Sequence, residues 1–322
     1  MGRVRSLPTV SIVIPASGAG ASLPAALRAV HDQTYPNIVD VIVAAADDDS
    51  AKAATASGAT TVPNPQGRTP TGLNRAIARS AGDVVVRVDA RSIIPENYVA
   101  QIVEALAETG ADNVGGMQVP VGRTFSERPI AAAMRSRAGA GGARYRVGGE
   151  RGPTDTVYLG AFRRETLERL GGFDERYERH QDYELNQRIR DQGGVVWFDP
   201  ELRVEYRPRS SLKALARQYY DFGKWKRRFA RDHPGTLLMR QKAPPTLVPI
   251  LALSLAGSLL WRPLLLLPAS YAAALIAAGL TQLRTAGPAA LGAPAALATM
   301  HLAWGLGFLV GQTKERQNES SR

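Results

Sequence analysis

The N-terminal third of the chain alternates between short apolar runs and segments with helical spacing. Residues 9–17 form a β-branched run that ends at a glycine-rich loop, and residues 39–50 form a second run that ends in three aspartates. Between them, Leu23, Leu27 and Val30 recur at the spacing of one helix face. Further strands are predicted at residues 82–90 and 112–121, and further helices at residues 71–80 and 96–110. This alternation predicts an α/β fold with a parallel sheet, whose ligands bind at the carboxyl ends of the strands.

The C-terminal part of the chain is strongly apolar. Short segments containing Arg262 and Arg284 separate three apolar stretches, which cover residues 246–261, 263–283 and 289–310. Helices of about 16 to 22 residues match the roughly 30 Å hydrocarbon core of a bilayer, the first stretch only marginally. The alternative is a set of buried helices in a soluble domain. We expect no signal peptide, because residues 1–8 are short and basic and lead into a strand. We therefore expect a multi-pass protein of the cell membrane with its N-terminal domain in the cytoplasm.

Charge and composition narrow the set of partners. The net charge of +11 and the pI of about 10.2 suit either a nucleic-acid binder or a protein held against an anionic membrane. Residues 203–242 contain twelve Lys and Arg against three acids, and they directly precede the apolar stretches. This position favours the membrane, and we expect no nucleic-acid partner. The chain has no cysteine, which excludes thiolate metal sites, catalytic thiols and redox switches.

The basic segment has a helical pattern of its own. Its apolar residues share one stripe, as in a helix that lies in a membrane interface: Leu212, Leu215, Tyr219, Phe222 and Phe229. Gln218, Asp221 and Trp225 share another face. We expect a catalytic domain over residues 1–208, a basic interfacial helix region over 209–243, about three membrane helices over 244–312 and a polar tail over 313–322.

Several sequence blocks carry a resemblance to a known family. The run TVSIVIPA, followed by HDQTYP, is similar to the opening of the inverting glycosyltransferase family 2, which has the GT-A fold. Five further blocks resemble the succinoglycan glucosyltransferases of the ExoA-like, membrane-associated subgroup and follow the same order. They begin at residues 64, 110, 155, 180 and 206.

The resemblance implies both a fold and a reaction. The fold would be GT-A, a Rossmann-like and mostly parallel sheet flanked by helices, followed by a C-terminal membrane helical region. The enzyme would move glucose from UDP-glucose onto a polyprenyl-diphosphate-linked saccharide, with Mg²⁺ or Mn²⁺ as cofactor. Such a reaction belongs to exopolysaccharide or cell-envelope glycan synthesis.

One aspartate stands where the family has a metal-binding pair. Family 2 enzymes hold a metal ion with an Asp-x-Asp at a strand end, and here the motif is Asp89-Ala90-Arg91. The resemblance implies that Asp89 ligates Mg²⁺ or Mn²⁺, which accept oxygen ligands and complete their shell with water and phosphate. Arg91 would add a cation near the diphosphate. The alternative is that Asp89 only caps the following turn.

The resemblance assigns the catalytic base to Asp182, with Glu184 as the next candidate. Inverting transfer needs a carboxylate on the face opposite the leaving group, and the family carries it as an acid that opens a helix. Residues 183–190 can form that helix, so its dipole would keep Asp182 ionised. The alternative is a simple helix cap.

Nucleotide binding falls on segments that depart from the family pattern. The loop after the first strand contains Pro15, Ala16 and Ser17, and its backbone N–H groups can face phosphate. Asp47 and Asp48 are candidates for the base and ribose, and we favour Asp47. The usual Ala-Arg-Asn motif here ends in Asn74 without its arginine, which Arg68 could replace unless it is merely solvated. Gln218 and Trp225 partly match the acceptor-binding motif of processive relatives, and the alternative for Trp225 is simple packing.

Two other functions compete with this interpretation. The stretch IPASGAGASL resembles the loop of sugar nucleotidyltransferases, but Ser22 stands where that loop needs arginine and no activating lysine follows closely. The second alternative is a catalytically silent membrane scaffold, which the altered Asp-x-Asp and the altered first loop suggest. It predicts that no nucleotide sugar is turned over.

Overall fold

The computed structural model describes residues 7–18 and 22–312. The expected polar tail and part of the glycine-rich loop lie outside these residues. The chain divides into two units. The sheet unit contains the described residues up to Val119 together with Gly148–Tyr206, and the helical unit contains Pro120–Val147 together with the described residues from Arg207 onward.

A nine-stranded sheet, counted over the described residues, forms the centre of the sheet unit. Its main path runs β3-β2-β1-β4-β8-β6-β9-β5, and β7 pairs with β9 off this path. The strands are β1 (Val10–Ala16), β2 (Ile38–Ala45), β3 (Thr60–Pro63), β4 (Val84–Arg87), β5 (Ser92–Ile93), β6 (Asn113–Pro120), β7 (Gly152–Pro153), β8 (Tyr158–Arg163) and β9 (Val196–Tyr206).

The sheet is mixed, with its parallel part built by the N-terminal strands. β1 pairs in parallel with β2 and with β4, and β2 pairs in parallel with β3. β8 is antiparallel to β4 and β6, and β9 is antiparallel to β5 and β7. The parallel part carries the strand ends at which the predicted aspartates lie.

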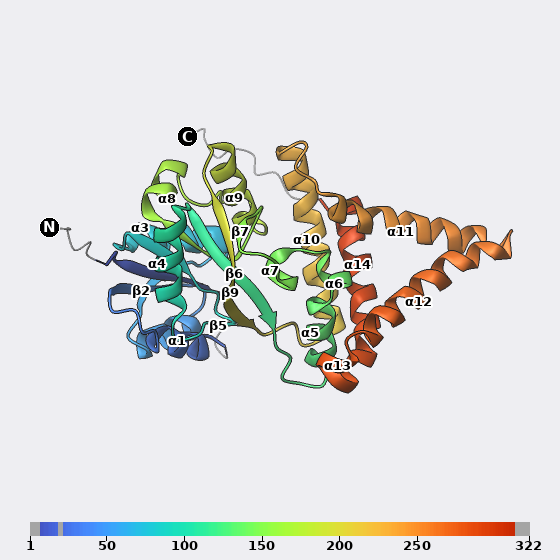
Figure 1. Ribbon diagram of the computed structural model, residues 1–322, viewed down its shortest axis with the longest axis horizontal. Coiled ribbons are helices and arrows are strands. Elements are labelled where there is room, and N and C mark those ends of the chain that lie inside the picture. Colours follow the sequence, from blue (N-terminus) through green and yellow to red (C-terminus); the bar gives the residue numbers. More distant parts are fainter. Residues whose placement is uncertain (1–6, 19–21, 313–322) are drawn as a thin grey trace. The chain divides into compact units, whose positions relative to one another are not determined.

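Helices cover this sheet, and Figure 1 shows α3 and α4 against it. They are α1 (Leu23–His31), α2 (Asp48–Ala56), α3 (Thr69–Arg79), α4 (Tyr98–Thr109), α8 (Arg164–Leu170) and α9 (Gln181–Asp191). α3 packs on β1 and β2. The predicted helix face of Leu23, Leu27 and Val30 is buried in the hydrophobic core, which confirms the periodicity from which it was inferred.

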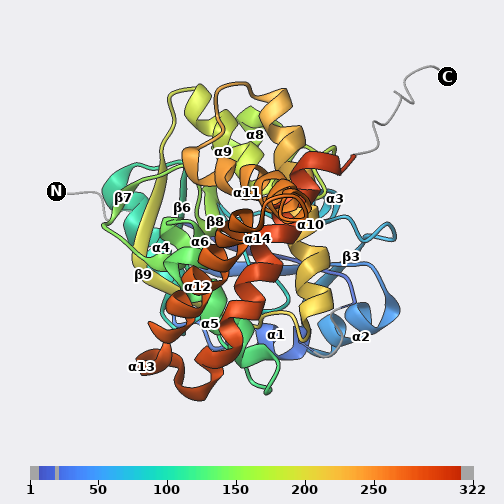
Figure 2. The same cartoon turned by 90° about the vertical axis from the view of Figure 1, so that its right-hand side faces the viewer.

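The helical unit is built around a close contact between two long helices. Its elements are α5 (Glu127–Arg135), α6 (Arg137–Ala140), α7 (Arg144–Val147), α10 (Leu212–Asp232), α11 (Met239–Gly257), η1 (Arg262–Leu265), α12 (Leu266–Leu280), α13 (Leu283–Ala286), η2 (Gly287–Gly292) and α14 (Ala293–Val310). α10 and α14 lie side by side in Figures 1 and 2. A methyl group at Gly223 would collide with the Trp304 carbonyl, and one at Gly307 with the Tyr220 carbonyl. The glycines therefore set how closely the two backbones approach.

The predicted amphipathic helix is confirmed as α10, but its apolar stripe is not an open surface. Leu215, Tyr219 and Phe229 are buried, and Tyr219 accepts a 2.6 Å hydrogen bond from Arg146. Only Leu212 at the start of the stripe is clearly exposed. The stripe is therefore mainly a packing face, and the location of α10 at a membrane surface stays a prediction.

Two helical segments among the described residues are long and apolar enough to cross a membrane, Arg262–Leu280 and Leu283–Val310. The first of the three predicted stretches instead lies mostly in α11, which has the polar residues Arg240, Gln241 and Lys242 in its first turn and contains three prolines. Its apolar part is short for a span because the first turn of the helix is polar. α11 and α12 still expose many large apolar side chains, including those of Leu253, Leu260 and Leu266.

Candidate active site

An open pocket of about 800 Å³ lies at the carboxyl ends of β1 and β2. Its lining includes Ser17, Gly18, Asp47, Asp49, Lys52 and Gly67. Pro15 and Ala16 form the end of β1 just before it, and the Ala16 carbonyl accepts a hydrogen bond from the Ala46 N–H. The pocket is thus made by the loops that follow the parallel strands, where the sequence predicted a nucleotide.

Asp47 is held in this pocket by hydrogen bonds from two segments, the start of α2 and the loop after β1. It caps the N-terminus of α2, where its carboxylate accepts a 2.9 Å hydrogen bond from the Ser50 N–H. Its other oxygen accepts a 2.8 Å hydrogen bond from the Gly18 N–H. The hydrogen bond from Gly18, followed by those from Ser50, lowers the pKa of Asp47 below its usual value. Asp48 is exposed in the first turn of α2 and is not part of the pocket lining.

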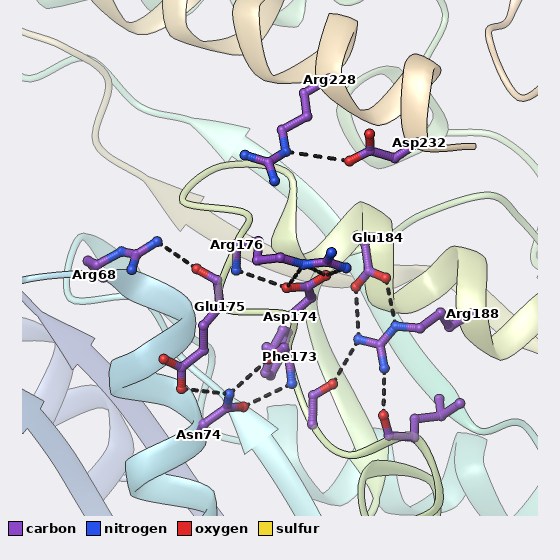
Figure 3. A network of polar contacts seen from close by, with 12 residues as sticks. Arg68, Asn74, Phe173, Asp174, Glu175, Arg176, Glu184, Arg188, Arg228 and Asp232 are labelled. Atoms are coloured by element: carbon purple, nitrogen blue, oxygen red, sulfur yellow. Dashed lines mark hydrogen bonds and ion pairs between the residues drawn. The ribbon is translucent and has the colours of Figure 1, made fainter. Parts of the chain in front are cut away.

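The N-terminal half of α3 holds the segment that leads to α9, as Figure 3 shows. Arg68, which precedes α3, donates a 2.6 Å hydrogen bond to the Glu175 carbonyl and lies 3.5 Å from the Glu178 carboxylate. Asn74 accepts a 2.9 Å hydrogen bond from the Phe173 N–H and donates one of 2.8 Å to the Phe173 carbonyl. Both candidate nucleotide residues therefore bind the chain itself in this structure, and their ligand roles stay predictions.

Glu184 is committed to an ion pair. Both of its carboxylate oxygens accept hydrogen bonds from Arg188, at 2.7 and 2.8 Å. Arg188 also donates to the carbonyls of Leu170 and Gly172, which fixes the end of α8 against α9 (Figure 3). Since Glu184 is only 3% exposed, this geometry suits a structural role better than that of a base.

Asp182 lies at the start of a helix, as the sequence predicted, and its role as base stays a prediction. It lies in the first turn of α9, and its side chain is 43% exposed. Its Oδ1 accepts a 2.8 Å hydrogen bond from the Tyr183 N–H, which leaves Oδ2 for other partners. His180 precedes the helix with a φ of 64°, a left-handed conformation that is uncommon outside glycine. Such strain next to a candidate catalytic residue is typical of functional sites.

Asp89 and Asp182 flank the same guanidinium group. Arg87, the last residue of β4, donates from Nε to the Asp89 Oδ1 at 2.9 Å, and its Nη2 lies 2.9 Å from the same oxygen. Its Nη1 lies 4.0 Å from the Asp182 Oδ2. Burial by itself lowers the pKa of Arg87, but the two carboxylates raise it overall, so the group is a permanent cation. Arg91, in contrast, is exposed.

Tyr158 supports Asp89 from the interior. Its hydroxyl is 2.6 Å from the Ser92 hydroxyl, and the Ser92 N–H donates to the Asp89 carbonyl. Burial, followed by the negative charge of Asp89, raises the pKa of Tyr158 well above its usual value, so it stays a neutral phenol. The turn after β4 is therefore held by packing and hydrogen bonds as well as by charge.

Gln218 and Trp225 lie on α10 in the helical unit. Trp225 is 6% exposed, and its ring has Lys224 at 5.9 Å and Arg228 at 5.6 Å from its centroid. Arg228 also pairs with Asp232 one turn later at 3.4 Å. With so little of its ring exposed, Trp225 packs against its neighbours and the two cations in this structure. The acceptor role of both residues stays a prediction.

Arg87 was not predicted as a site residue, because in the sequence it is only one member of the strand at residues 82–90. The available signal was its distance of two positions from Asp89, because residues i and i+2 of an extended strand share a face. The sequence analysis also missed the clamp formed by α3 on residues 173–178. No local signal predicts that contact, which joins segments about a hundred positions apart.

The model of the family described as glycosyltransferase like family 2 matches residues 8–220 of the chain. The chain belongs to glycosyltransferase family 2. It is 30% identical to the succinoglycan biosynthesis protein ExoA of Rhizobium meliloti (strain 1021) over 251 residues. The aligned region covers 76% of this chain and 75% of that protein.

Two of the solved structures that resemble the fold are compared with this chain. The mannosyltransferase PcManGT from Pyrobaculum calidifontis, in complex with GDP-Man and Mn²⁺, superposes with a TM-score of 0.61 at 21% identity, over 93% of this chain and 88% of that one. Residues 1–349 of TarS from S. aureus give a TM-score of 0.50 at 13% identity, over 92% and 90%. With the family match, the first of these likenesses confirms the predicted GT-A fold.

Proposed function

We propose that this family 2 glycosyltransferase transfers glucose from UDP-glucose, with inversion, to a polyprenyl-diphosphate-linked saccharide at the cell membrane. The proposal places it in exopolysaccharide or cell-envelope glycan synthesis, as the name of its relative ExoA suggests. The single observation that carries the enzymatic part is the meeting of Asp89 and Asp182 at Arg87. Two acids 93 positions apart in sequence come to one guanidinium at the end of a sheet strand.

In the proposed reaction, Asp182 is the general base. Its Oδ2 accepts the proton of the acceptor hydroxyl as that oxygen attacks the anomeric carbon of the donor. The bond from that carbon to the diphosphate breaks at the same time, and its electron pair leaves with UDP. The exposure of Asp182 suits this role, because the acceptor has to reach the carboxylate from solvent. The ion pair of Glu184 with Arg188 makes that residue the weaker candidate.

Asp89 would hold the divalent ion that the family implies. Its Oδ1 is bound to Arg87, but its side chain is 30% exposed and its Oδ2 accepts no hydrogen bond from the described residues. The described residues contain no cluster of three acids or histidines that could cage a metal. This donor set fits an ion that takes one carboxylate from the protein and its other oxygens from the diphosphate and water. Such an ion neutralises the charge that develops on the leaving diphosphate.

The donor would lie in the pocket beside Asp47. A carboxylate whose pKa is lowered stays ionised and accepts hydrogen bonds from ribose hydroxyls or from the N–H of a uracil. Lys52 and the backbone near Gly67 can face the negative part of the donor. The preference for UDP-glucose rests on the resemblance to ExoA-like proteins. PcManGT, which shares only the fold, was solved with GDP-Man, so the nucleotide needs a direct test.

The proposal of a lipid-linked acceptor is supported by the two candidate membrane helices and by the basic residues of α10 and its flanks. An acceptor anchored by a polyprenyl chain is confined to the same surface as the enzyme, which raises its local concentration. Gln218 and Trp225 are the residues that we propose for its saccharide.

The test is transfer of label from a panel of nucleotide sugars to a membrane lipid extract, with Mn²⁺ or with EDTA. We expect one donor to be used, a loss of transfer with EDTA, and a loss with Asp182→Asn and with Asp89→Asn. Asp191→Asn is the matched control, because Asp191 lies on the same helix but is exposed at its other end. If wild-type protein uses no donor under any condition, the silent membrane scaffold is the better account.

A further inference from the structure

The cluster at the end of β4 contains a buried cation, Arg87, to which the sequence analysis assigned no role. Arg87 is 8% exposed, and its three guanidinium nitrogens point at two different carboxylates. A guanidinium cannot be deprotonated in proteins and is strongly directional, so it fixes the geometry of its partners as well as their charge. Arg87 is therefore a fixed, buried part of this site and not a solvated surface charge.

The charge balance shows what this cation does. Asp89 and Asp182 together carry two negative charges, and Arg87 cancels one of them. An Asp-x-Asp motif would instead place two carboxylates at the strand end, where they attract a metal ion without help from the donor. Because the Asp89 carboxylate is already bound to a guanidinium, the site without nucleotide should bind a divalent ion weakly. The diphosphate has to supply the missing negative charge.

We propose that Arg87 is a positioning residue that links the metal-binding carboxylate of Asp89 to the base Asp182 and makes metal binding depend on the nucleotide. The inference rests on the proposed function. It adds that the cation beside the altered Asp-x-Asp motif is the buried Arg87, and that this cation joins the donor end of the site to the acceptor end. Arg87 is not expected to touch the substrate.

Binding of Mn²⁺ to the full chain, followed by electron paramagnetic resonance, tests the proposal without any turnover. Wild-type protein should bind Mn²⁺ weakly alone and more tightly with UDP. Arg87→Gln should bind Mn²⁺ without UDP about tenfold more tightly than wild type, because one unit charge a few ångströms from a divalent ion changes its affinity by about this factor. Arg79→Gln, which removes an exposed cation at the end of α3, should leave the affinity unchanged.

A second variant separates charge from geometry. Arg87→Lys keeps the positive charge but loses the planar fork that reaches both carboxylates. It should keep the weak Mn²⁺ binding of wild type, while kcat falls at least tenfold with little change in the KM for the donor. It also carries the test if Arg87→Gln does not fold.

Two results would overturn the proposal. One is an unchanged affinity for Mn²⁺ in folded Arg87→Gln, which would make Arg87 a purely structural residue. The other is full kcat in Arg87→Lys, which would show that the link to Asp182 does not matter. Failure of the proposed function is a different result, namely wild-type protein that transfers no sugar, and the Mn²⁺ titrations can be interpreted in either case.

Discussion

Neutralising Asp182 and neutralising Glu184 should have opposite consequences, although the two acids are one half-turn apart on α9. Asp182→Asn keeps the Oδ1 that accepts from the Tyr183 N–H and loses a charge that is 43% exposed and lies 4.0 Å from Arg87. Its stability should therefore change by less than about 1 kcal/mol. Loss of a general base lowers kcat by about 10²- to 10⁴-fold. We expect a folded protein that no longer transfers sugar.

Glu184→Gln keeps the shape of the side chain but loses its charge-assisted hydrogen bonds to Arg188. The pair is nearly buried on the Glu184 side, and Arg188 also holds the carbonyls of Leu170 and Gly172. A hydrogen bond to a charged group contributes about 1.5–3 kcal/mol, and a loss of that size lowers the melting temperature of a unit of this length by about 3–10 °C. Per folded molecule, kcat should stay within about threefold of wild type, because Glu184 does not reach the substrate.

Both variants are to be measured in the full-length protein in detergent, with kcat at saturating donor and the thermal midpoint from the same preparation. The assignment of the base is wrong if Glu184→Gln loses a hundredfold in kcat at an unchanged midpoint. It is equally wrong if Asp182→Asn keeps kcat within threefold of wild type.

Three further outcomes are expected. Burial raises the pKa of Asp112, but hydrogen bonds from the Val195 N–H, the Thr166 hydroxyl and the Arg169 guanidinium outweigh it and lower the pKa overall. The stability that Asp112 contributes is therefore fully present above about pH 4 and is lost as the pH falls through the lowered value. Asp112→Asn should flatten the fall of the thermal midpoint below about pH 4, and an unchanged fall would contradict this. Gly223→Ala should destabilise the helical unit by about 1–3 kcal/mol, because the added methyl group collides with the Trp304 backbone carbonyl, which cannot rotate away. Denaturant titration of the full chain measures this loss of stability. An unchanged stability would mean that α10 and α14 separate easily. Asn74→Ala removes the hydrogen-bond partner of the Phe173 N–H and carbonyl, which costs about 1–3 kcal/mol. Hydrogen exchange of the Phe173 amide should become faster, with no matching change in α10. The clamp of α3 on residues 173–178 is refuted if the Phe173 amide is as well protected in the variant as in wild type.

The sequence predicted well those elements whose pattern is local. The apolar run of β1 and the helical spacing of Leu23, Leu27 and Val30 are decided by which residues face the core, and each occurs as predicted. The acid that opens α9 is also a local feature, and Asp182 lies in its first turn.

The antiparallel part of the sheet was not predicted, because its pairing is not local. β8 joins the parallel strands by pairing with β4, which lies more than seventy positions earlier in the sequence. No periodicity in residues 158–163 predicts this partner. The same reason explains why the role of Arg87 was not predicted. Its contact with Asp89 follows from strand geometry, but its approach to Asp182 depends on where β8 and α9 place the second acid.

The apolar stripe of α10 was interpreted as membrane-facing, but most of it is buried. A stripe of this width fits a membrane surface and a partner helix equally well, since both present an apolar face. The glycines at 223 and 307 were the better signal, because small residues let two helices approach closely.

α3 joins the two ends of the proposed reaction, and this limits how its variants can be interpreted. Its N-terminus follows Gly67 of the donor pocket, and its side chains hold the segment that leads to Asp182. If Arg68 were to grip a donor phosphate, it would have to leave the Glu175 carbonyl and Glu178. Arg68→Ala would then alter the donor affinity and the placement of the base together. A lower kcat in that variant is therefore no proof of phosphate contact unless the KM for the donor rises as well while Asn74→Ala leaves that KM unchanged.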